Sequence, residues 1–421
     1  MPSGPARCVV GGNGRTRTLT RDRISFLFLN LGHFFDHLII LVFATAAALV
    51  LVHEWAIPYP ELIPYATPGL IAFGVGALPA GWIADKWSRE AMMVVFFLGL
   101  GAAGTATALA DTPLQIGVGL FLIGLFASIY HPVGLALVVE GRRQTGMPLA
   151  INGVFGNMGV ACAALLTGWF IDVAGWRAAF AVPGTLCFAL GCAYAIFLYG
   201  GRHRPRDLAP HQPDDKGDSA WTAELDRRML VRVFGVVFFT TAVGGLIFQS
   251  TTFALPKVFE ERLSDLAGTN TLIGWYAFLA FAIAALAQLV VGHLVDNYSI
   301  RTVFACIAAL QAVLFAVMQH LTGAAALLVA VCFMLAVFGQ IPINDVLIGR
   351  ATSSAWRSRA YSIRFVITFA VAATAVPMIA FIRASWDFAA LFLVLAVAAS
   401  AIFVAALLLP DTGTPSRTAA R

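Results

Sequence analysis

Twelve long apolar runs are the feature that most limits how this chain can fold. Each run holds about 18 or more residues, enough for a helix to cross the roughly 30 Å hydrocarbon core of a bilayer. The runs lie at residues 24–52, 65–85, 91–110, 113–139, 148–172, 178–199, 230–255, 271–295, 300–319, 323–349, 360–382 and 387–409. Charged residues make up only 12% of the chain, about half of their usual share in a soluble domain. We therefore expect an all-α membrane protein with twelve transmembrane helices.

The one long polar stretch of the chain lies between the sixth and the seventh run. Residues 201–229 contain three prolines and the segment Asp214-Asp215-Lys216-Gly217, a composition typical of a linker. This linker separates two halves of six runs each. The expected parts are a disordered tail at 1–23, an N-terminal six-helix bundle at 24–200, the linker at 201–229, a C-terminal six-helix bundle at 230–409 and a tail at 410–421.

The distribution of Lys and Arg predicts how the chain is oriented in its membrane. Of the 27 Lys and Arg residues, twenty-two lie in the tails, the linker and the loops on the same side as the linker, and four lie on the other side. Because cytoplasmic segments carry the excess of basic residues, we expect both termini and the linker in the cytoplasm. The net charge of +5 is dispersed in this way, so it does not indicate a nucleic-acid partner.

Several kinds of function find no support in the sequence. Five of the six cysteines lie inside apolar runs, and no Cys-x-x-Cys pair or zinc spacing occurs, so a disulfide framework is not expected. No Gly-x-x-x-x-Gly-Lys-Ser/Thr motif is present, so ATP-driven work is not expected. A membrane enzyme would need a nucleophile and a set of oxyanion donors that these residues do not supply. We expect no cofactor and no enzymatic activity.

The two halves repeat each other in sequence. The segment from Gly81 to Arg89 follows the second run, and the segment from Gly292 to Ile300 follows the eighth, at an offset of 211 residues. A Trp-centred segment at Trp176 also recurs at Trp386. Two parallel six-helix repeats are an architecture of secondary transporters, which bind substrate between the halves near the middle of the bilayer.

The segment from Gly81 to Arg89, read Gly-Trp-Ile-Ala-Asp-Lys-Trp-Ser-Arg, resembles the signature between the second and third helices of the major facilitator superfamily. The echo at Gly292 and Asp296 and the twelve runs extend this resemblance over nearly the whole chain. The resemblance implies alternating access, with a conformational lock in the outward-open state. The residues assigned to that lock are Gly81, Asp85, Arg89 and Asp296. From the residues alone, Asp85 is also a candidate to cap the N-terminus of the third helix, and the two roles are compatible.

A narrower resemblance concerns the fosmidomycin-resistance branch of bacterial exporters. It is carried by Gly32-His33-Phe34-Phe35-Asp36 in the first run, Tyr130-His131-Pro132 in the fourth, and the segment from Gly153 to Gly159 in the fifth. Members of that branch usually carry an acid after the His-Pro pair, and Val133 stands there in this chain. The resemblance implies a bacterial inner-membrane protein that exports drug-like or anionic compounds.

Asp36 is the best candidate for a proton carrier. It lies near the middle of the first apolar run, where an ionised group costs about 2.5–3.5 kcal/mol on insertion scales. His33 and His37 share its helix face because the three residues are spaced i, i+3, i+4. We expect His33, His37 or His131 to act as its partner, since imidazole titrates near neutral pH. Two alternatives stay open: an Asp–His pair that only holds the first and fourth helices together, and a nitrogen–oxygen site for a divalent metal ion.

Prolines at matching depth in the two halves point to the substrate site. Pro132 and Pro342 each leave a backbone carbonyl without its helical donor, and broken helices at equivalent places are a pointer to a transporter's site. The alternative is two kinked packing helices whose polar groups act as glue. Residues expected to line the substrate cavity are Tyr130, Asn157, Gln249, Gln340, Asn344, Asp345 and Arg364. For Arg364 the simpler interpretation is a side chain that snorkels to the membrane surface, and the alternative is a pair with Asp345 or with an anionic substrate.

We therefore expect a secondary active transporter that moves a small organic solute by alternating access with proton coupling, working as a monomer. Export of a drug-like or anionic compound is the first expectation, and uptake of an organic anion is the second. A transporter of a divalent metal ion that uses His33, Asp36, His37 and His131 is a further alternative.

Overall fold

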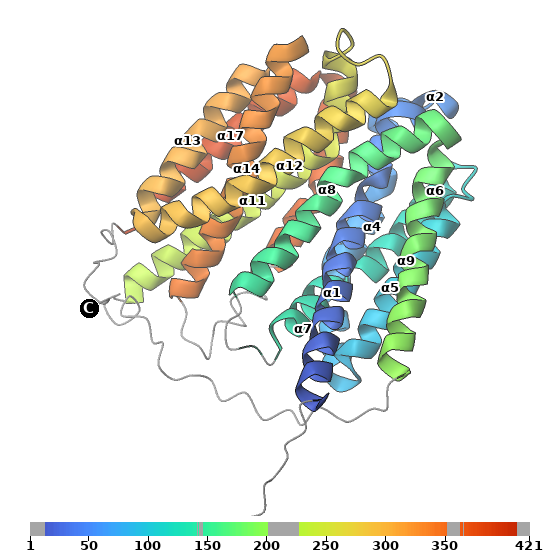
Figure 1. Ribbon diagram of the computed structural model, residues 1–421. Coiled ribbons are helices and arrows are strands. Elements are labelled where there is room, and N and C mark those ends of the chain that lie inside the picture. The colour runs from blue at the N-terminus through green and yellow to red at the C-terminus, as the bar shows by residue number, and fades with distance from the viewer. Residues whose placement is uncertain are drawn as a thin grey trace, which may run out of the picture.

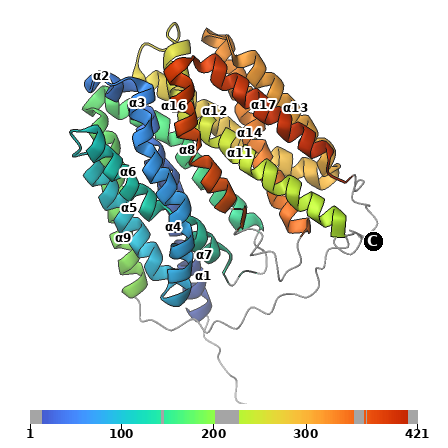
Figure 2. The same ribbon diagram turned by 180° about the vertical axis from the view of Figure 1, so that it is seen from behind.

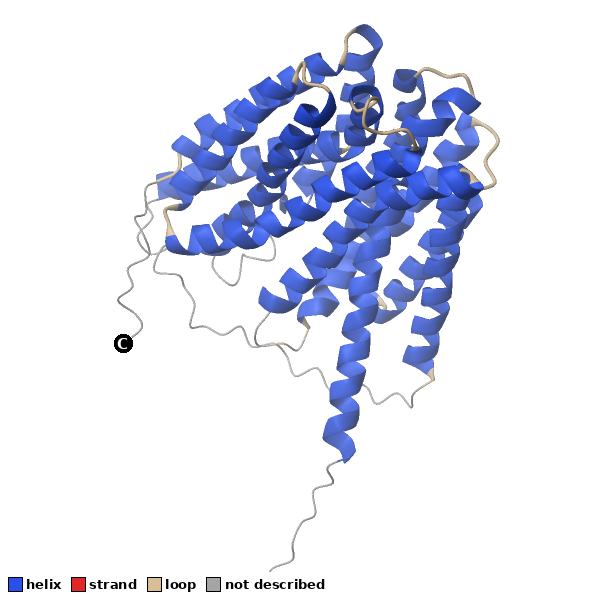
Figure 3. Cartoon of the chain, turned by 45° about the horizontal axis from the view of Figure 1, so that its top comes forward, coloured by secondary structure: helices blue, strands red, loops and turns tan. Residues whose placement is uncertain are grey.

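The computed structural model describes residues 13–140, 142, 146–200, 227–351, 363–364 and 366–410 of this chain. Within these residues every regular element is a helix, as Figure 3 shows. Twelve of the helical segments in that part are long and apolar enough to cross a membrane. The expected fold class, an all-α protein with twelve transmembrane helices, is confirmed.

The N-terminal half contains six of these spans. Its elements are α1 (Asn13–Ala46), a π-helical turn η1 (Ala47–Leu51), α2 (Val52–Glu54), α3 (Tyr59–Leu62), a 3₁₀ turn η2 (Ile63–Ala66), α4 (Thr67–Lys86), α5 (Arg89–Thr107), α6 (Pro113–Ala127), a π-helical turn η3 (Tyr130–Gly134), α7 (Leu135–Val139), α8 (Gly146–Ala174) and α9 (Trp176–Tyr199). The turns η1, η2 and η3 join their neighbours into longer spans, so Pro113–Val139 crosses as one unit.

The C-terminal half contains the other six spans. Its elements are α11 (Arg227–Arg262), α12 (Asn270–Asn297), α13 (Ile300–Met318), α14 (Gly323–Ala351), α16 (Ala375–Ser385) and α17 (Phe388–Leu407). Residues 363–364 and 366–372 are also helical, and the eleventh span runs over Val366–Ser385.

Three expectations about the chain's course need correction. The tail at 1–23 is not disordered as far as residue 23, because α1 already begins at Asn13. The second span begins at Tyr59 and not at residue 65, because its prolines lie in the first turns of α3 and η2, where a missing N–H costs little. The third correction concerns Pro342, which lies inside an uninterrupted α14 and does not break it. Residues 1–12, the linker at 201–226 and the tail from 411 lie outside the described residues.

The helices form two groups that match the two halves of the sequence. Figures 1 and 2 show the groups side by side, leaning together at one end of the molecule and separating toward the other. We call the end that carries Tyr199 and Arg227 the linker end, and the opposite end the far end. Between the two groups, α1 lies against α11 and α8 lies against α12, and η3 faces the eleventh span.

Candidate functional site

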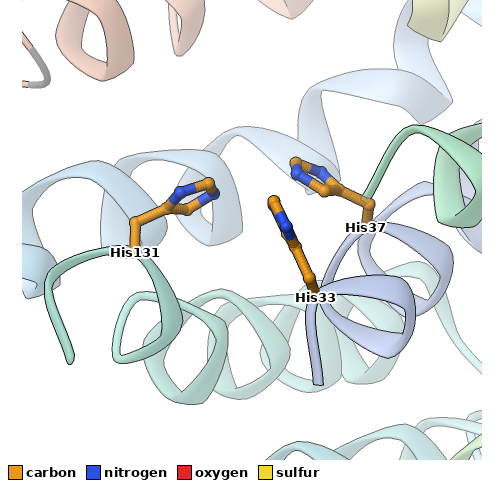
Figure 4. Close-up of side chains that lie close together, drawn as sticks. All are labelled: His33, His37 and His131. Carbon is orange, nitrogen blue, oxygen red and sulfur yellow. The ribbon is translucent and has the colours of Figure 1, made fainter. Parts of the chain in front are cut away.

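Three histidines of the N-terminal half meet at mid-depth. His33 and His37 lie one turn apart on α1, and His131 reaches them from η3 (Figure 4). Their ring centroids are 5.0 Å apart for His33–His37, 5.4 Å for His33–His131 and 5.5 Å for His37–His131. Each ring offers one nitrogen within 4.8 Å of the others. The helix spacing predicted the first pair, and the fold brings in the third ring. We call His33, His37, His131 and Asp36 the histidine cluster.

Asp36 is the only acidic side chain that is fully buried in the described part of the chain, with no exposed surface. Its Oδ2 lies 3.7 Å from Nε2 of His131, and neither carboxylate oxygen makes a hydrogen bond within the described residues. A buried carboxyl group without hydrogen-bond donors is costly to keep in a membrane helix. The Nδ1 and Nε2 atoms of His131 are also buried, and His33 is nearly buried, so in this state the carboxyl of Asp36 and the ring nitrogens of His131 are closed off from water.

A network of buried amides holds His33 in place. The Nδ1 atom of His33 donates to the carbonyl oxygen of Asn152 at 2.8 Å. The Nδ2 atom of Asn152 donates to Oδ1 of Asn30 at 2.9 Å and to the Tyr130 hydroxyl at 2.8 Å. That hydroxyl donates in turn to the carbonyl oxygen of Leu29 at 2.7 Å. Tyr130 is fully buried, so in this state it supports the cluster from behind and does not line an open space.

Asn30 and Asn152 were missed as site residues from the sequence. The signal was present, because each is an amide inside an apolar run, and Asn30 lies one turn before His33. Polar side chains in membrane spans are costly unless a partner satisfies them. The partner of each lies on another helix, and that pairing is visible only once α1, η3 and α8 are placed side by side.

Glycines of α8 make the room for the cluster. A Cβ atom at Gly156 would lie 2.6 Å from Nε2 of His33, and one at Gly159 would lie 2.3 Å from the backbone oxygen of Phe34. Real Cβ atoms do not approach this closely. At Gly159 the obstacle is the backbone of α1, so this position needs glycine, whereas at Gly156 a Cβ atom would force the His33 ring to turn. The Gly153–Gly159 segment is therefore part of the site through its lack of side chains.

The fourth span widens where His131 enters. Tyr130–Gly134 forms a single π-helical turn that contains Pro132. Proline lacks the backbone N–H that would donate to the preceding helical turn. A π turn accommodates this loss locally, and such turns often occur at functional sites. The expectation of a broken helix agrees with the structure at Pro132. It does not agree at Pro342, because α14 continues through that residue without interruption.

An aromatic pair from both halves covers His131. Phe369 of the eleventh span lies 4.9 Å from Phe73 of α4 and 5.3 Å from His131, measured between ring centroids. Phe73 lies 5.7 Å from the His131 ring. Edge-on contacts of this kind contribute about 0.5–1.5 kcal/mol beyond burial. The cluster is thus in contact with the C-terminal half through Phe369.

Polar residues of the C-terminal half fall into two groups. Gln340 and Asn344 are buried, and both bond to Thr240: its hydroxyl donates to Oδ1 of Asn344 at 3.0 Å, and Nε2 of Gln340 donates to its carbonyl at 3.4 Å. These bonds join α11 to α14, the role of polar glue between membrane helices. Asn157 and Gln249 are half-buried, and Nε2 of Gln249 has no hydrogen bond within the described residues.

Arg364 does not snorkel to the surface, which corrects the simpler of the two interpretations. Its side chain is only 10% exposed and pairs with the carboxylate of Asp345, which is 43% exposed. An almost buried guanidinium is held in place by a partner that water can reach.

The residues assigned to the conformational lock lie at the linker end of α4, α5 and α12. Asp85 accepts a hydrogen bond of 2.8 Å from Arg89, and both side chains are largely exposed. The N-cap of α5 is Ser88, whose hydroxyl accepts from the backbone of Ala91, so Asp85 is not the cap of the third helix. A Cβ at Gly81 would touch only Pro132, and Asp296 is exposed.

The two halves contact each other closely at the far end. Asp172 of α8 accepts hydrogen bonds at 2.8 Å from Nδ2 of Asn270, at 2.7 Å from the backbone N–H of Thr271 and at 2.5 Å from the Thr271 hydroxyl. A Cβ at Gly168 would lie 2.3 Å from the Asn270 carbonyl, so the two helices touch backbone to backbone. Nζ of Lys257 also lies over the Tyr59 ring, at 5.9 Å from its centroid. We call the Asp172–Asn270–Thr271 contact the far-end latch.

Comparison with protein families gives a match over nearly the whole chain. The family model described as Major Facilitator Superfamily matches residues 29–265 and 258–421. Comparison with solved structures gives a D-xylose-proton symporter, with a TM-score of 0.70 and 16% identity over 92% of this chain and 97% of that one. At that identity the likeness bears on the fold alone.

Comparison with curated proteins gives transporters of aromatic acids that match only part of this chain. A gallate transporter of Pseudomonas putida is 27% identical over 142 residues, which are 33% of this chain and 32% of that protein. The 4-hydroxybenzoate transporter PcaK of Pseudomonas aeruginosa is 25% identical over 52% of each chain. The chain thus spans between a third and about half of the length of these relatives. The PcaK protein of Acinetobacter baylyi is 24% identical over 74% of this chain and 76% of that protein.

Proposed function

This chain belongs to the Major Facilitator Superfamily, and on that premise we propose that it moves a small aromatic carboxylate across the cytoplasmic membrane together with a proton. The family and the fold make it a transporter of small organic solutes and not an enzyme. We propose an aromatic carboxylate as the substrate because the names of the relatives specify gallate and 4-hydroxybenzoate. The site supports this class, because the aromatic rings of Phe73 and Phe369 lie beside His131 of the histidine cluster, whose side chains can bind protons.

The observation that carries the proposal is the carboxyl of Asp36. It has no exposed surface and no hydrogen bond within the described residues, and it lies 3.7 Å from Nε2 of His131, a ring nitrogen that is itself buried. In the proposed cycle this carboxyl gains or loses its proton only when water or a cation reaches it. Movement of the halves would change that access, so Asp36 can take up a proton on one side and release it on the other.

Electrostatics favour symport over antiport for an anionic solute. An ionised Asp36 would repel a carboxylate bound beside the histidine cluster, whereas a protonated Asp36 would not. The proton and the anion therefore favour each other's binding, and this coupling is reciprocal. An inward proton gradient would then drive uptake. The resemblance to fosmidomycin-resistance exporters favours export instead, which would need a solute that displaces the proton.

Alternating access follows from the two ends of the molecule. The far-end latch holds α8 to α12, while Asp85 and Arg89 at the linker end bond to each other. With the linker end in the cytoplasm, as the basic residues indicate, this is an inward-facing state. Closing the linker end would engage Asp85 with the other half and release the latch. One chain supplies both halves, so a monomer is sufficient.

The test is flux into proteoliposomes that contain the full chain. Radiolabelled 4-hydroxybenzoate and gallate are the probes, with and without an imposed pH gradient. We expect gradient-driven accumulation by the wild type, and we expect Asp36→Asn to lose it while still exchanging labelled for unlabelled substrate. Asp265→Asn, a change of an exposed acid in a far-end loop, is the matched control.

Three outcomes would count against the proposal in different ways. Gradient-driven accumulation by Asp36→Asn at the wild-type rate would remove Asp36 from the coupling mechanism. Accumulation of either probe only when the gradient is directed outward would replace symport with antiport. If neither probe moves at any pH, the substrate class is wrong.

One observation favours a second candidate function, transport of a divalent metal ion. His33, His37 and His131 converge to within 4.8 Å, and Asp36 adds a carboxylate. Imidazole and carboxylate ligands suit Zn²⁺, Ni²⁺ or Cu²⁺. Calorimetry of the purified protein with each ion, repeated on His37→Ala, decides between the candidates. Binding that His37→Ala abolishes would promote the metal candidate, and absence of binding would dismiss it.

A further inference from the structure

A groove between α13 and α17 lies far from the histidine cluster. It has a volume of about 240 Å³ and is lined by Arg301, Thr302, Ala305, Cys306, Ala309, Phe403 and Leu407. Figures 1 and 2 show α13 and α17 at the edge of the C-terminal half that is farthest from the N-terminal half. The groove therefore opens toward the surrounding membrane and not toward the substrate path.

The shape of the groove follows from residue size. On α13 the lining residues are spaced i, i+1, i+4, i+5 and i+8, which places them on one stripe. Most are small, so α13 forms a shallow floor. Phe403 and Leu407 lie one turn apart on α17 and form a tall apolar wall beside it. Cys306, Thr302 and Leu407 are exposed along this channel. A channel of this form fits a flexible hydrocarbon chain.

One end of the groove carries the positive charge of Arg301. Arg301 lies in the first turn of α13, at the linker end, and is half-buried. Within the described residues its guanidinium makes no hydrogen bond and no ion pair, and the first turn of α13 contains no acidic residue. The nearest acid along the chain is the exposed Asp296, which has another partner. The backbone N–H groups at the start of α13 add positive character.

From this combination we propose that the groove binds one anionic phospholipid of the cytoplasmic leaflet. Arg301 and the Thr302 hydroxyl hold the phosphate, and the apolar channel takes an acyl chain. A guanidinium matches the geometry of a phosphate with two parallel hydrogen bonds. Basic pockets between membrane helices on the cytoplasmic side bind acidic head groups. The groove is on the side that the distribution of Lys and Arg assigns to the cytoplasm.

The binding experiment uses native mass spectrometry of the full chain in detergent, titrated with dioleoylphosphatidylglycerol and, separately, with dioleoylphosphatidylcholine. We expect the wild type to retain the anionic lipid preferentially. Arg301→Gln should lower its affinity about five-fold, the factor expected for one basic residue near a membrane surface. Arg232→Gln is the matched control. Arg232 is an exposed arginine of α11 that also lies at the linker end of the molecule, but it lies outside the groove. Both variants have the same net charge.

A second variant tests the channel separately from the charge. Cys306→Phe fills the groove from an exposed position, so it should reduce retention of the anionic lipid without lowering the melting temperature. Equal retention of the two lipids by the wild type, or wild-type retention by Arg301→Gln, would overturn the proposal. Oxidative cross-linking of Cys306 between two chains in vesicles, undiminished by added phosphatidylglycerol, would assign the groove to a second copy and also overturn it.

Discussion

At the scale of single residues, the site depends as much on a missing side chain as on the charged ones. His33 fits against α8 because Gly156 has no Cβ, whereas Gly153, one turn earlier, has nothing within 4 Å of the place where its Cβ would be. We expect Gly156→Ala to lower stability by about 1–3 kcal/mol through overpacking and to slow transport by turning the His33 ring. Gly153→Ala should be neutral or slightly stabilising, since alanine favours helix. Thermal unfolding and flux of the two variants check this.

Two outcomes would contradict the prediction for these two glycines. If Gly156→Ala matched Gly153→Ala in both melting temperature and flux, the packing of α8 against His33 would not be as close as described. A loss of stability with normal flux would show that the position of His33 does not matter for transport.

The Arg364–Asp345 pair allows a prediction that separates substrate binding from structure. Asp345 is 43% exposed, while Arg364 is 10% exposed. If Arg364 binds the carboxylate of the substrate, Asp345 competes with that substrate, and Asp345→Asn should tighten binding several-fold while lowering the melting temperature. Arg364→Gln should weaken binding. Equilibrium binding of 4-hydroxybenzoate to the purified variants is the measurement. Unchanged affinity in both variants would confine the pair to a structural role.

At the scale of helices, the far-end latch is where the two halves are held together. Asp172 makes two charge-assisted bonds to Thr271. Because Asp172 is exposed, water screens these bonds, and the charge contributes about 1 kcal/mol or less, as in surface ion pairs. Asp172→Asn removes the charge, so we expect it to move the population toward the state with the linker end closed. Spin labels at Tyr199 and Tyr298, both exposed at the linker end, should then show a new population at shorter distance.

Asp111→Asn is the control for this shift. Asp111 is also an exposed acid at the far end, but it pairs with Arg177 within the N-terminal half. Its replacement should leave the distance distribution unchanged. If both variants produced the same distribution as the wild type, the latch would not set the balance between states.

The helices could be predicted from the sequence because each one must satisfy its own backbone in the bilayer, so length and hydropathy suffice. The same holds for the alignment of His33, Asp36 and His37, which helical periodicity alone determines. The course of α14 through Pro342 could not be predicted, because neighbouring helices decide whether a proline breaks a span. The cap at Ser88 in place of Asp85, and the amide network through Asn152, likewise depend on contacts between elements that no local pattern specifies.

At the scale of the whole molecule, Asp36 limits the number of protons moved in each cycle. It is the only buried acid among the described residues, so one proton should accompany one monocarboxylate, and the transport cycle should carry no net charge. A gradient of one pH unit would then support about ten-fold accumulation. A membrane potential of 100 mV acts with about 2.3 kcal/mol on each net charge moved, or roughly 50-fold in accumulation, and should here have no effect.

Proteoliposomes loaded with potassium and treated with valinomycin separate these two driving forces. We expect 4-hydroxybenzoate to accumulate when a pH gradient is imposed at zero potential, and to equilibrate without accumulation when a potential is imposed at equal pH. Accumulation driven by the potential alone would mean that a second charge crosses with the substrate. The histidine cluster would then be the first place to look for it, since His131 lies within 3.7 Å of Asp36 and is partly exposed. His131→Gln should in that case restore insensitivity to the potential.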